Sequence, residues 1–324
     1  MTSKTTSKGG VELQARDYGA LNGLFESRVM LRSHFIALYF SDQPEYGKKR
    51  IQRLVEGKFI GERKPQANHG TFLPSFLYLT RRGLEALEEQ SAVVATHGLS
   101  WDELMKRTDV AESTLHHELE IVGMKSALTK ALRSCPMFSV TEFATWPRLY
   151  EFKTEHLDTR ERITLKPDAY IEIHESVDDE VAEHRFFLEH DRGSEVLQRL
   201  AVKAHGYSSF YRTGGLAIRF GFDPSDYKDF PFRVLITLLN EERRNNVAER
   251  LLKEAHFLKQ QFLLTTLDEF IRDPLAPIWM TLKDYAQATA ETIYDPRQHT
   301  ARRRVTPRDR MVAERVTKRS LFAN

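Results

Sequence analysis

In the first hundred residues, apolar side chains recur at helical spacing between positions rich in lysine and arginine. Residues 27–39 follow this spacing, which predicts a helix with one buried face. A second helix is expected after an N-cap at Ser41 or Asp42, and Gly57 can end it in the left-handed conformation. The inward side of this second helix consists of Ile51, Leu54 and Val55.

The segment that follows, 59–89, changes from helical to strand-like patterning. It predicts a short strand, a turn rich in Pro, Asn and Gly, a second strand over Phe76–Leu79 and a helix capped at Thr80. Helix, basic helix, two strands and closing helix is the order of a winged helix-turn-helix. The stretch from Ile51 to Leu87, with TRRG near its end, resembles bacterial DNA-binding domains of this kind.

Basic side chains project from the second helix and from the strand after it. In a winged helix-turn-helix the basic helix enters the major groove, and residues near the wing lie beside the DNA. The same module can also serve protein–protein contact or dimerisation, but the Lys, Arg and Gln at the outward positions favour DNA. The predicted DNA-binding residues of this region are Lys48, Lys49, Arg50, Arg53, Arg63 and Lys64.

The second half of the chain alternates between strand-like and helical patterns. Residues 112–134 predict a long amphipathic helix, and the later pattern places hairpin strands first and a strand–helix–strand crossover afterwards. This order implies an α+β or α/β fold with a mixed sheet flanked by helices. Strands are expected at 138–146, 163–174, 185–191, 232–239 and 261–267, and further helices at 193–211 and 241–259.

Carboxylates fall at the ends of the two middle strands. Asp168 follows Pro167 in one of them, and Glu189 and Asp191 lie in the other. Magnesium prefers carboxylate oxygens, so acids from neighbouring strands can hold it against a phosphate, and a nearby lysine can stabilise the developing charge. Asp168 and Glu189 are therefore the candidate metal ligands, and an enzymatic role would require Mg²⁺ or Mn²⁺.

These motifs resemble two related groups of proteins. The order of the core resembles the PD-(D/E)xK nucleases, a restriction-endonuclease-like fold. KPDAYIEI, FFLEHDRGSE, Lys203 and Tyr207, together with the winged helix, resemble the plasmid replication-relaxation proteins over roughly 25–260. The resemblance implies a role in replication or relaxation of mobile-element DNA. A similar layout in one class of mobilisation relaxases would imply nicking at a transfer origin.

One position departs from the nuclease pattern. Asp191 stands where (D/E)xK has its lysine, while some nucleases of this superfamily supply that lysine from the following helix. Two interpretations stay open: an active nuclease, or a decayed core kept for scaffolding and DNA contact. In the first, Asp168, Glu189 and Asp191 bind the metal, Glu195 is an auxiliary acid, and Lys203 is the displaced base or charge stabiliser.

Other candidate groups are weaker. Neighbouring His116 and His117 point about 100° apart on a helix, and HExxH is absent, so a structural role is favoured, although Glu118 could serve as an acid before the sheet. Tyr207 and Tyr211 share one helix face, and packing against the sheet is favoured over a nucleophilic role. The sequence lacks both a P-loop and a G-x-G-x-x-G fingerprint, which leaves nucleotide hydrolysis and dinucleotide binding unsupported.

The composition of the chain indicates how many cores it can form and in which compartment it acts. At 41% hydrophobic the 324-residue chain can form two cores, and a single cysteine, Cys135, excludes disulfides and favours a reducing compartment. With no apolar leader and no long apolar stretch, we expect a cytoplasmic protein that does not bind membranes.

Nine basic and two acidic residues give 297–324 a charge of +7, so the rest of the chain is acidic overall. Phosphate contact by Arg302, Arg303 and Arg304 is predicted there.

Four segments are therefore expected: a flexible N-terminus over 1–20, a winged helix-turn-helix over 21–95, a nuclease-like domain over 105–285 and a basic tail over 286–324. The leading hypothesis is a DNA-binding protein for replication, relaxation or mobilisation of plasmid or integrative-element DNA. The alternatives are a metal-dependent nickase or relaxase, and a winged-helix transcriptional regulator. Double-stranded DNA is the expected partner, with replication or mobilisation proteins and a second copy of the chain as further candidates.

Overall fold

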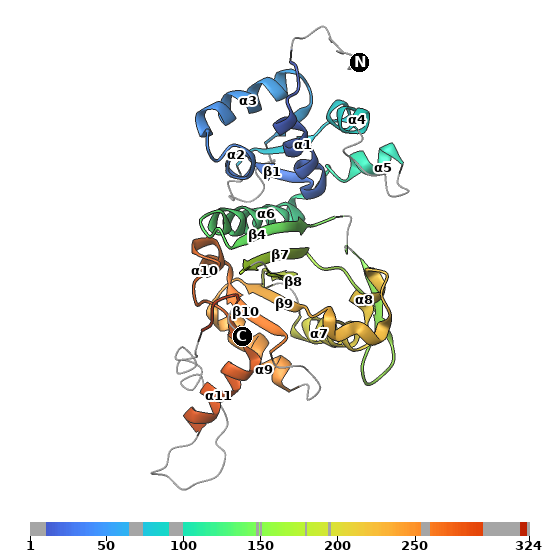
Figure 1. The fold of residues 1–324 in the computed structure, drawn as a ribbon, viewed down its shortest axis with the longest axis vertical. Coiled ribbons are helices and arrows are strands. Elements are labelled where there is room, and N and C mark those ends of the chain that lie inside the picture. Colours follow the sequence, from blue (N-terminus) through green and yellow to red (C-terminus); the bar gives the residue numbers. More distant parts are fainter. Residues whose placement is uncertain are drawn as a thin grey trace. The chain divides into compact units, whose positions relative to one another are not determined.

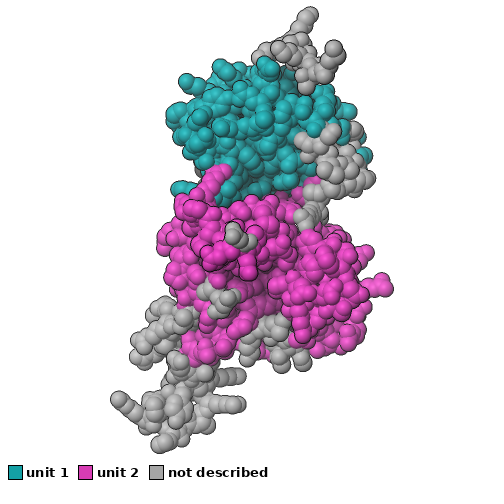
Figure 2. All heavy atoms as spheres, in the orientation of Figure 1, with its two compact units in different colours: residues 1–130 teal, residues 131–324 magenta. Residues whose placement is uncertain are grey.

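The computed structural model divides the chain into two compact units, residues 1–130 and 131–324 (Figure 2). Each unit is described by itself. The structure describes residues 11–64, 74–90, 100–146, 149, 151–178, 180–193, 196–253, 260–293 and 318–322.

Unit 1 consists of helices around a three-stranded antiparallel sheet with strand order β1-β3-β2 (Figure 1). Its core includes Val29 and Phe76 from two strands and Leu115 and Leu119 from the helix that leads out of the unit. The elements are α1 (Ala15–Ser27), β1 (Val29–Leu31), α2 (Arg32–Tyr39), α3 (Pro44–Glu56), β2 (Ile60–Arg63), β3 (Phe76–Leu79), α4 (Arg81–Glu89), α5 (Trp101–Lys106) and α6 (Glu112–Arg133).

Several local predictions for unit 1 are confirmed. β2, β3 and the helix after them lie where the pattern placed them, and the Thr80 side chain accepts the backbone N–H of Gly83 as the expected N-cap. Gly83 itself is required by close packing, since a Cβ at this position would lie 2.1 Å from the carbonyl oxygen of Phe59. The closing helix therefore packs directly on the turn before β2.

Other predictions for this region are wrong. The polar segment 15–20, expected to be flexible, forms the start of α1, and residues 29–31 form strand β1 because they pair with β3. The N-cap of α3 is Gln43 instead of Ser41 or Asp42. Gly57 has a right-handed φ of −73°, and the left-handed residue is Lys58, with φ of 58°. These positions depend on tertiary pairing, which local spacing does not report.

Unit 2 is built on a mixed six-stranded sheet with strand order β11-β10-β9-β8-β7-β4, which confirms the expected sheet flanked by helices (Figure 1). Strands β8, β9 and β10 run parallel, and the other pairs are antiparallel. Its elements are β4 (Phe138–Ala144), β5 (Phe152–Glu155), β6 (Arg162–Leu165), β7 (Ala169–Val177), β8 (Glu180–Asp191), α7 (Leu197–Arg212), α8 (Gly215–Arg219), the 3-10 helix η1 (Pro224–Asp229), β9 (Arg233–Leu238), α9 (Glu241–Leu252), β10 (Phe262–Thr266), α10 (Leu267–Arg272), β11 (Met280–Thr281) and α11 (Leu282–Ile293).

The segment predicted as one strand over 163–174 forms two. β6 pairs with β5 in a separate hairpin, and β7 joins the main sheet. Pro167 lies between them, where it lacks the N–H that a continuous ladder would need. The break places Asp168 immediately before the first residue of β7, and thus fixes where its carboxylate meets the sheet.

One face of the sheet is covered by α7, α9 and α11, whose apolar residues join those of β7 to β10 in one core. Figure 1 shows α7 and α9 lying together against the strands, and they also contact each other. Phe187 of β8 lies within this core, against Tyr170 of β7 and Tyr207 of α7. Side chains alternate along β8, so Glu189 and Asp191 belong to the same covered face.

The end of the chain is anchored on unit 2. Arg319 pairs with Trp279 through backbone hydrogen bonds and binds the carboxylate of Asp284, while Leu321 is buried. Residues 286–293 belong to α11, so both flanks of the basic segment are attached to the unit. Arg302, Arg303 and Arg304 lie outside the described residues. None of the helices in the described ranges has both the length and the apolar character that crossing a bilayer requires.

Candidate acidic site and basic surface

Asp168 and Glu189 meet at the junction of β7 and β8. The backbone N–H of Asp168 donates to the carbonyl of Leu188 at 2.9 Å, and the Asp168 carboxylate accepts the N–H of His190 at 2.7 Å. Asp168 is therefore fixed beside residues 188 and 190 of the neighbouring strand. Two acids from adjacent strands lie together, as the sequence pattern predicted.

The carboxylate of Glu189 is enclosed by two side chains of α7. Nζ of Lys203 donates to Oε2 at 2.8 Å, and the hydroxyl of Tyr207 donates to Oε1 at 2.5 Å. Glu189 is 3% exposed and Tyr207 is 1% exposed. Because Lys203 and Tyr207 are four residues apart on one helix, a single helix face supplies both donors.

Burial is the main cause of the unusual acidity of Glu189. The pKa of this carboxyl is raised to about 7, chiefly by burial and also by the nearby charge of Asp168, although Lys203 and the hydrogen bond from Tyr207 act in the opposite direction. The pKa of Tyr207 lies well above its ordinary value, chiefly through burial and then through the charge of Glu189. The site can therefore hold an exchangeable proton near neutral pH.

Asp191 is held apart from this pair by its own partners. Its Oδ2 accepts from Nε of Arg243 at 2.7 Å, and its Oδ1 accepts the backbone N–H of Gly193 at 2.8 Å. Both carboxylate oxygens thus tie the end of β8 to α9 and to the following turn. Arg243, which the sequence reasoning missed, supplies a positive charge beside the acid that stands in the lysine position of the nuclease pattern. The sequence indicates a role for Arg243 only through its position, in the first turn of a helix that follows a buried strand.

His190 faces the opposite side of the sheet. Its Nδ1 lies 2.9 Å from the hydroxyl of Thr237, its register partner on β9. Both side chains are buried, and the Thr237 hydroxyl also lies 3.4 Å from the carbonyl of Glu189. This polar link fixes β8 against β9 at the level of the acids. Glu195, the predicted auxiliary acid, lies outside the described residues.

Hard-ion ligands are present in this cluster. Asp168 and Glu189 offer carboxylate oxygens of the type that Mg²⁺ or Mn²⁺ prefers, and Lys203 supplies a positive charge beside them. Glu189 would have to be ionised and exchange its contact with Lys203 for the ion. The donor set therefore suits a hard divalent ion, which would bind more tightly above the pKa of Glu189.

The predicted basic surface of unit 1 is present in part. Lys48, Lys49 and Arg53 are exposed on α3, while the apolar side of this helix is buried. Lys48 pairs with Glu45 at 2.7 Å on the helix surface. Three basic side chains therefore remain on the solvent side of α3.

Arg50 requires a correction, because it does not lie on that surface. It is 4% exposed, and its guanidinium binds both carboxylate oxygens of Asp17, at 2.9 and 2.5 Å. Helical spacing from the buried Ile51 and Leu54 could have shown that Arg50 points inward. Arg50 is thus a structural residue that joins α3 to α1.

The basic residues at the end of β2 are exposed. Arg63 lies 5.2 Å from the centre of the Tyr78 ring and forms an ion pair with Asp109 at 2.8 Å. Lys64 is exposed directly after the strand. Glu118, considered as an acid for the sheet, instead binds Arg28 at 2.6 Å within unit 1.

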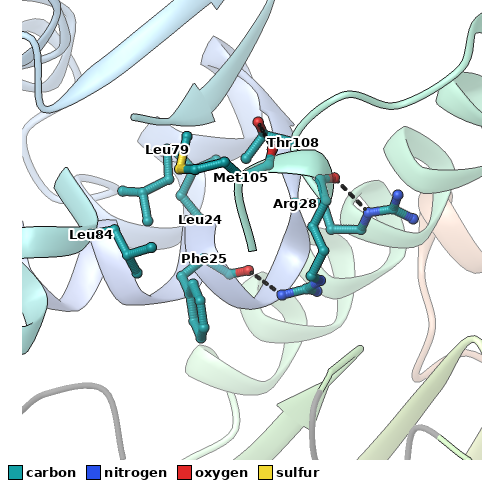
Figure 3. A pocket seen from close by; sticks show the side chains of 8 residues that line it. Leu24, Phe25, Arg28, Leu79, Leu84, Met105 and Thr108 are labelled. Atoms are coloured by element: carbon teal, nitrogen blue, oxygen red, sulfur yellow. Dashed lines mark hydrogen bonds between the residues drawn. The ribbon is translucent and has the colours of Figure 1, made fainter. Parts of the chain in front are cut away.

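The interior of unit 1 contains a small cavity beside α1 and α5, shown in Figure 3. Arg28 and Arg107 close one side of it through bonds to backbone carbonyls of Arg107 and Phe25. Its volume is about 10 Å³, close to the space of a single water molecule. This cavity is too small to take an organic ligand.

Comparison with known proteins gives one family. Neither the curated proteins nor the solved structures include a match to the chain. The family model described as replication-relaxation matches residues 21–222, which is more than half of the sequence and includes α3, both acids and α7. The chain belongs to the replication-relaxation family.

Proposed function

We propose that the chain is a double-stranded-DNA-binding protein that acts in replication, relaxation or mobilisation of plasmid or integrative-element DNA, with unit 1 as a winged helix-turn-helix. Family membership supports the role in replication or relaxation. The observation that carries DNA binding is the exposed basic side of α3, formed by Lys48, Lys49 and Arg53.

The arrangement of unit 1 supports this use of α3. Helix α2 packs against α3, and strands β2 and β3 form an antiparallel pair after it, which is the element order of a winged helix-turn-helix. Lys49 and Arg53 are one turn apart and exposed, so both can reach one groove of DNA. Arg63 and Lys64, exposed at the end of β2, would lie at the start of the wing. The segment with Arg302, Arg303 and Arg304 would add phosphate contacts without sequence preference.

The double variant Lys49→Ala/Arg53→Ala is expected to bind duplex DNA at least about 30-fold more weakly, because each lost base or phosphate contact is worth roughly 1–3 kcal/mol. The slope of log K against log salt should also become shallower by one to two. Fluorescence anisotropy over a salt series measures both quantities. Lys106→Ala, which removes an exposed lysine from α5, is the matched control. Equal affinity and slope in the double variant and the wild type would refute this use of α3.

A second candidate function is metal-dependent DNA nicking by unit 2, on a nuclease-like core. The specific observation in its favour is the position of Lys203, whose amine lies 2.8 Å from Glu189 at the point where Asp168 joins the strand pair. This helix lysine stands in for the lysine that the motif lacks at Asp191. The arrangement thus supports the active interpretation over a decayed core.

In this mechanism Asp168 and Glu189 would hold Mg²⁺ or Mn²⁺, which supplies a Lewis acid for the scissile phosphate and lowers the pKa of bound water. Lys203 would balance the charge that develops on the phosphate oxygens. Tyr207 is positioned to keep Glu189 oriented through its 2.5 Å hydrogen bond. Arg243 holds Asp191, so that this third acid adds less negative charge to the site.

Nicking of supercoiled plasmid DNA that carries the cognate site is expected with Mn²⁺ and with wild-type protein. Asp168→Asn, which keeps the hydrogen bond to His190, and Lys203→Met should both reduce nicking to background, because one removes a metal ligand charge and the other the stabilising cation. Gel electrophoresis measures nicking as the conversion of supercoiled plasmid to open circles. Glu172→Gln on the same strand β7 is the control and should keep nicking. Should wild type and Asp168→Asn be equally inert, unit 2 is a binding scaffold.

A further inference from the structure

Two histidines and an aspartate, side chains of the type that ligate metals, lie together on the side of α7 that is turned away from Glu189. His156 follows β5, Asp158 lies in the loop between β5 and β6, and His205 belongs to α7. One ligand atom from each lies within 4.8 Å of the others. The two imidazole rings are stacked, with centres 3.8 Å apart and planes at 26°. Residues far apart in sequence thus bring two imidazoles and a carboxylate to one point.

We propose that His156, Asp158 and His205 bind one divalent transition-metal ion of the zinc class, which ties the β5–β6 loop to α7. Two imidazole nitrogens and one carboxylate oxygen are a donor set that suits such ions and differs from the all-oxygen set of Asp168 and Glu189. Asp158 is exposed and His156 is half-buried, so solvent can reach the ion as a fourth ligand.

The fold prepares this site from the side of the helix. His205 is 2% exposed on α7, and the hairpin is held close because the helix residue beside it is Gly206. A Cβ at Gly206 would lie 3.0 Å from Leu165 and 3.2 Å from Ile163, both of β6. A Cβ at this position would be tight against these methyl groups, so the small residue favours the close packing of the hairpin on α7.

The loop side of the site can adjust. Nδ1 of His156 accepts the backbone N–H groups of Asp158 and Thr159 at 3.2 and 3.3 Å, so its lone pair is engaged within the loop by two long hydrogen bonds. Ligand atoms of a tetrahedral zinc ion are about 3.4 Å apart. Binding therefore requires the exposed loop to close by up to about 1.4 Å and the stacked His156 ring to turn, so that both imidazole lone pairs point at one ion.

The ion would act on the helix that carries Lys203 and Tyr207. Each of these is two residues from His205, about 200° around the helix, so α7 faces Glu189 on one side and the metal on the other. A bound ion fixes α7 against the hairpin from outside. This site is independent of DNA cutting, since it needs neither Asp168 nor Glu189.

The test uses the full chain and two metals. Isothermal titration with Zn²⁺ should show one tight site in the wild type, and Co²⁺ should give the visible absorption of a four-coordinate ion. His156→Ala and Asp158→Asn, both in the loop, should weaken Zn²⁺ binding by more than about tenfold and remove the Co²⁺ bands. These loop variants avoid replacing the buried His205.

Two controls separate this site from other metal binding. His174→Ala removes a half-buried histidine from β7, and Asp168→Asn alters the other acidic cluster; both should keep the Zn²⁺ affinity and the Co²⁺ spectrum. Zn²⁺ should also raise the melting temperature of the wild type, by mass action, and leave that of Asp158→Asn unchanged. The proposal is overturned if wild type binds no Zn²⁺, or if His156→Ala and Asp158→Asn bind it as the wild type does.

Discussion

Replacing Arg50 by alanine is expected to destabilise unit 1 by about 3–5 kcal/mol, because it leaves the Asp17 carboxylate buried without its cation. Asp17 is 1% exposed and forms two hydrogen bonds with the Arg50 guanidinium. The same guanidinium also donates to the carbonyl of Glu12 at 2.7 Å. After the substitution the backbone N–H of Gln14, at 2.7 Å, would remain as a donor to Asp17.

Hydrogen exchange resolved by mass spectrometry can assign this loss to unit 1. Peptides from α1 and α3 should exchange faster in Arg50→Ala, while peptides from β8 and β9 keep their protection. Arg53→Ala on the same helix removes an exposed arginine and should leave exchange unchanged while weakening DNA binding. If both variants exchange like the wild type, the Arg50–Asp17 pair contributes nothing measurable to the fold of unit 1.

A comparison of Arg50→Ala with the double variant Asp17→Asn/Arg50→Met would separate loss of the cation from loss of packing. In the double variant no buried charge remains, so a large part of the stability should return. Recovery of exchange protection in α1 and α3 measures this. A double variant as unstable as Arg50→Ala would show that the arginine acts through packing instead.

The second large effect concerns Glu189 and pH. Its pKa is about 7 in the folded protein against 4.5 for the ordinary carboxyl, so the folded state holds a proton that the unfolded chain releases. Between these two values the folded state binds more protons, and stability therefore falls as pH rises. Through this carboxyl alone, the free energy of unfolding should fall by roughly 3 kcal/mol between pH 4.5 and 7. The glutamine in Glu189→Gln does not titrate, so this variant should lack the part of the pH-dependent fall in stability that Glu189 causes.

Urea unfolding at a series of pH values measures the difference in the free energy of unfolding between Glu189→Gln and the wild type. Trp146 and Trp279 belong to unit 2 and Trp101 to unit 1, so a Trp101→Phe background makes tryptophan fluorescence a probe of unit 2. The stability of Glu189→Gln relative to wild type should rise by a few kcal/mol across that window. Glu155→Gln, an exposed acid of the β5–β6 hairpin, is the control. Parallel pH profiles for Glu189→Gln and wild type would contradict the assignment.

Mn²⁺ extends this test to the proposed metal site. An ion bound by Asp168 and Glu189 favours the charged carboxylate and lowers the pKa of Glu189, so the pH-dependent loss of stability should shrink in its presence. The same addition should have no such effect in Glu189→Gln. This measurement reports metal binding at the acids even if the protein does not cut DNA.

Local sequence patterns determined the main elements of both units. Alternation and apolar runs located the strands of the mixed sheet, and the Thr80 cap and the helical stripe of Ile51 and Leu54 located two helices of unit 1. These features depend on side-chain period and capping, which act within a few residues. The same short range explains why Asp168 and Glu189 could be predicted as a pair, since each follows from its place on a strand.

Tertiary structure decided the features that depend on distant partners. Strand β1 exists because Val29–Leu31 pair with β3, although their spacing looks helical. Arg50 is buried because it pairs with Asp17 of α1, and the packing of the β5–β6 hairpin on α7 brings His156 onto His205. Likewise Lys203 reaches Glu189 only through the packing of α7 on the sheet. The sequence supplies the chemical groups, and long-range packing decides which of them meet, since burial and pairing energies depend on neighbours that local spacing does not contain.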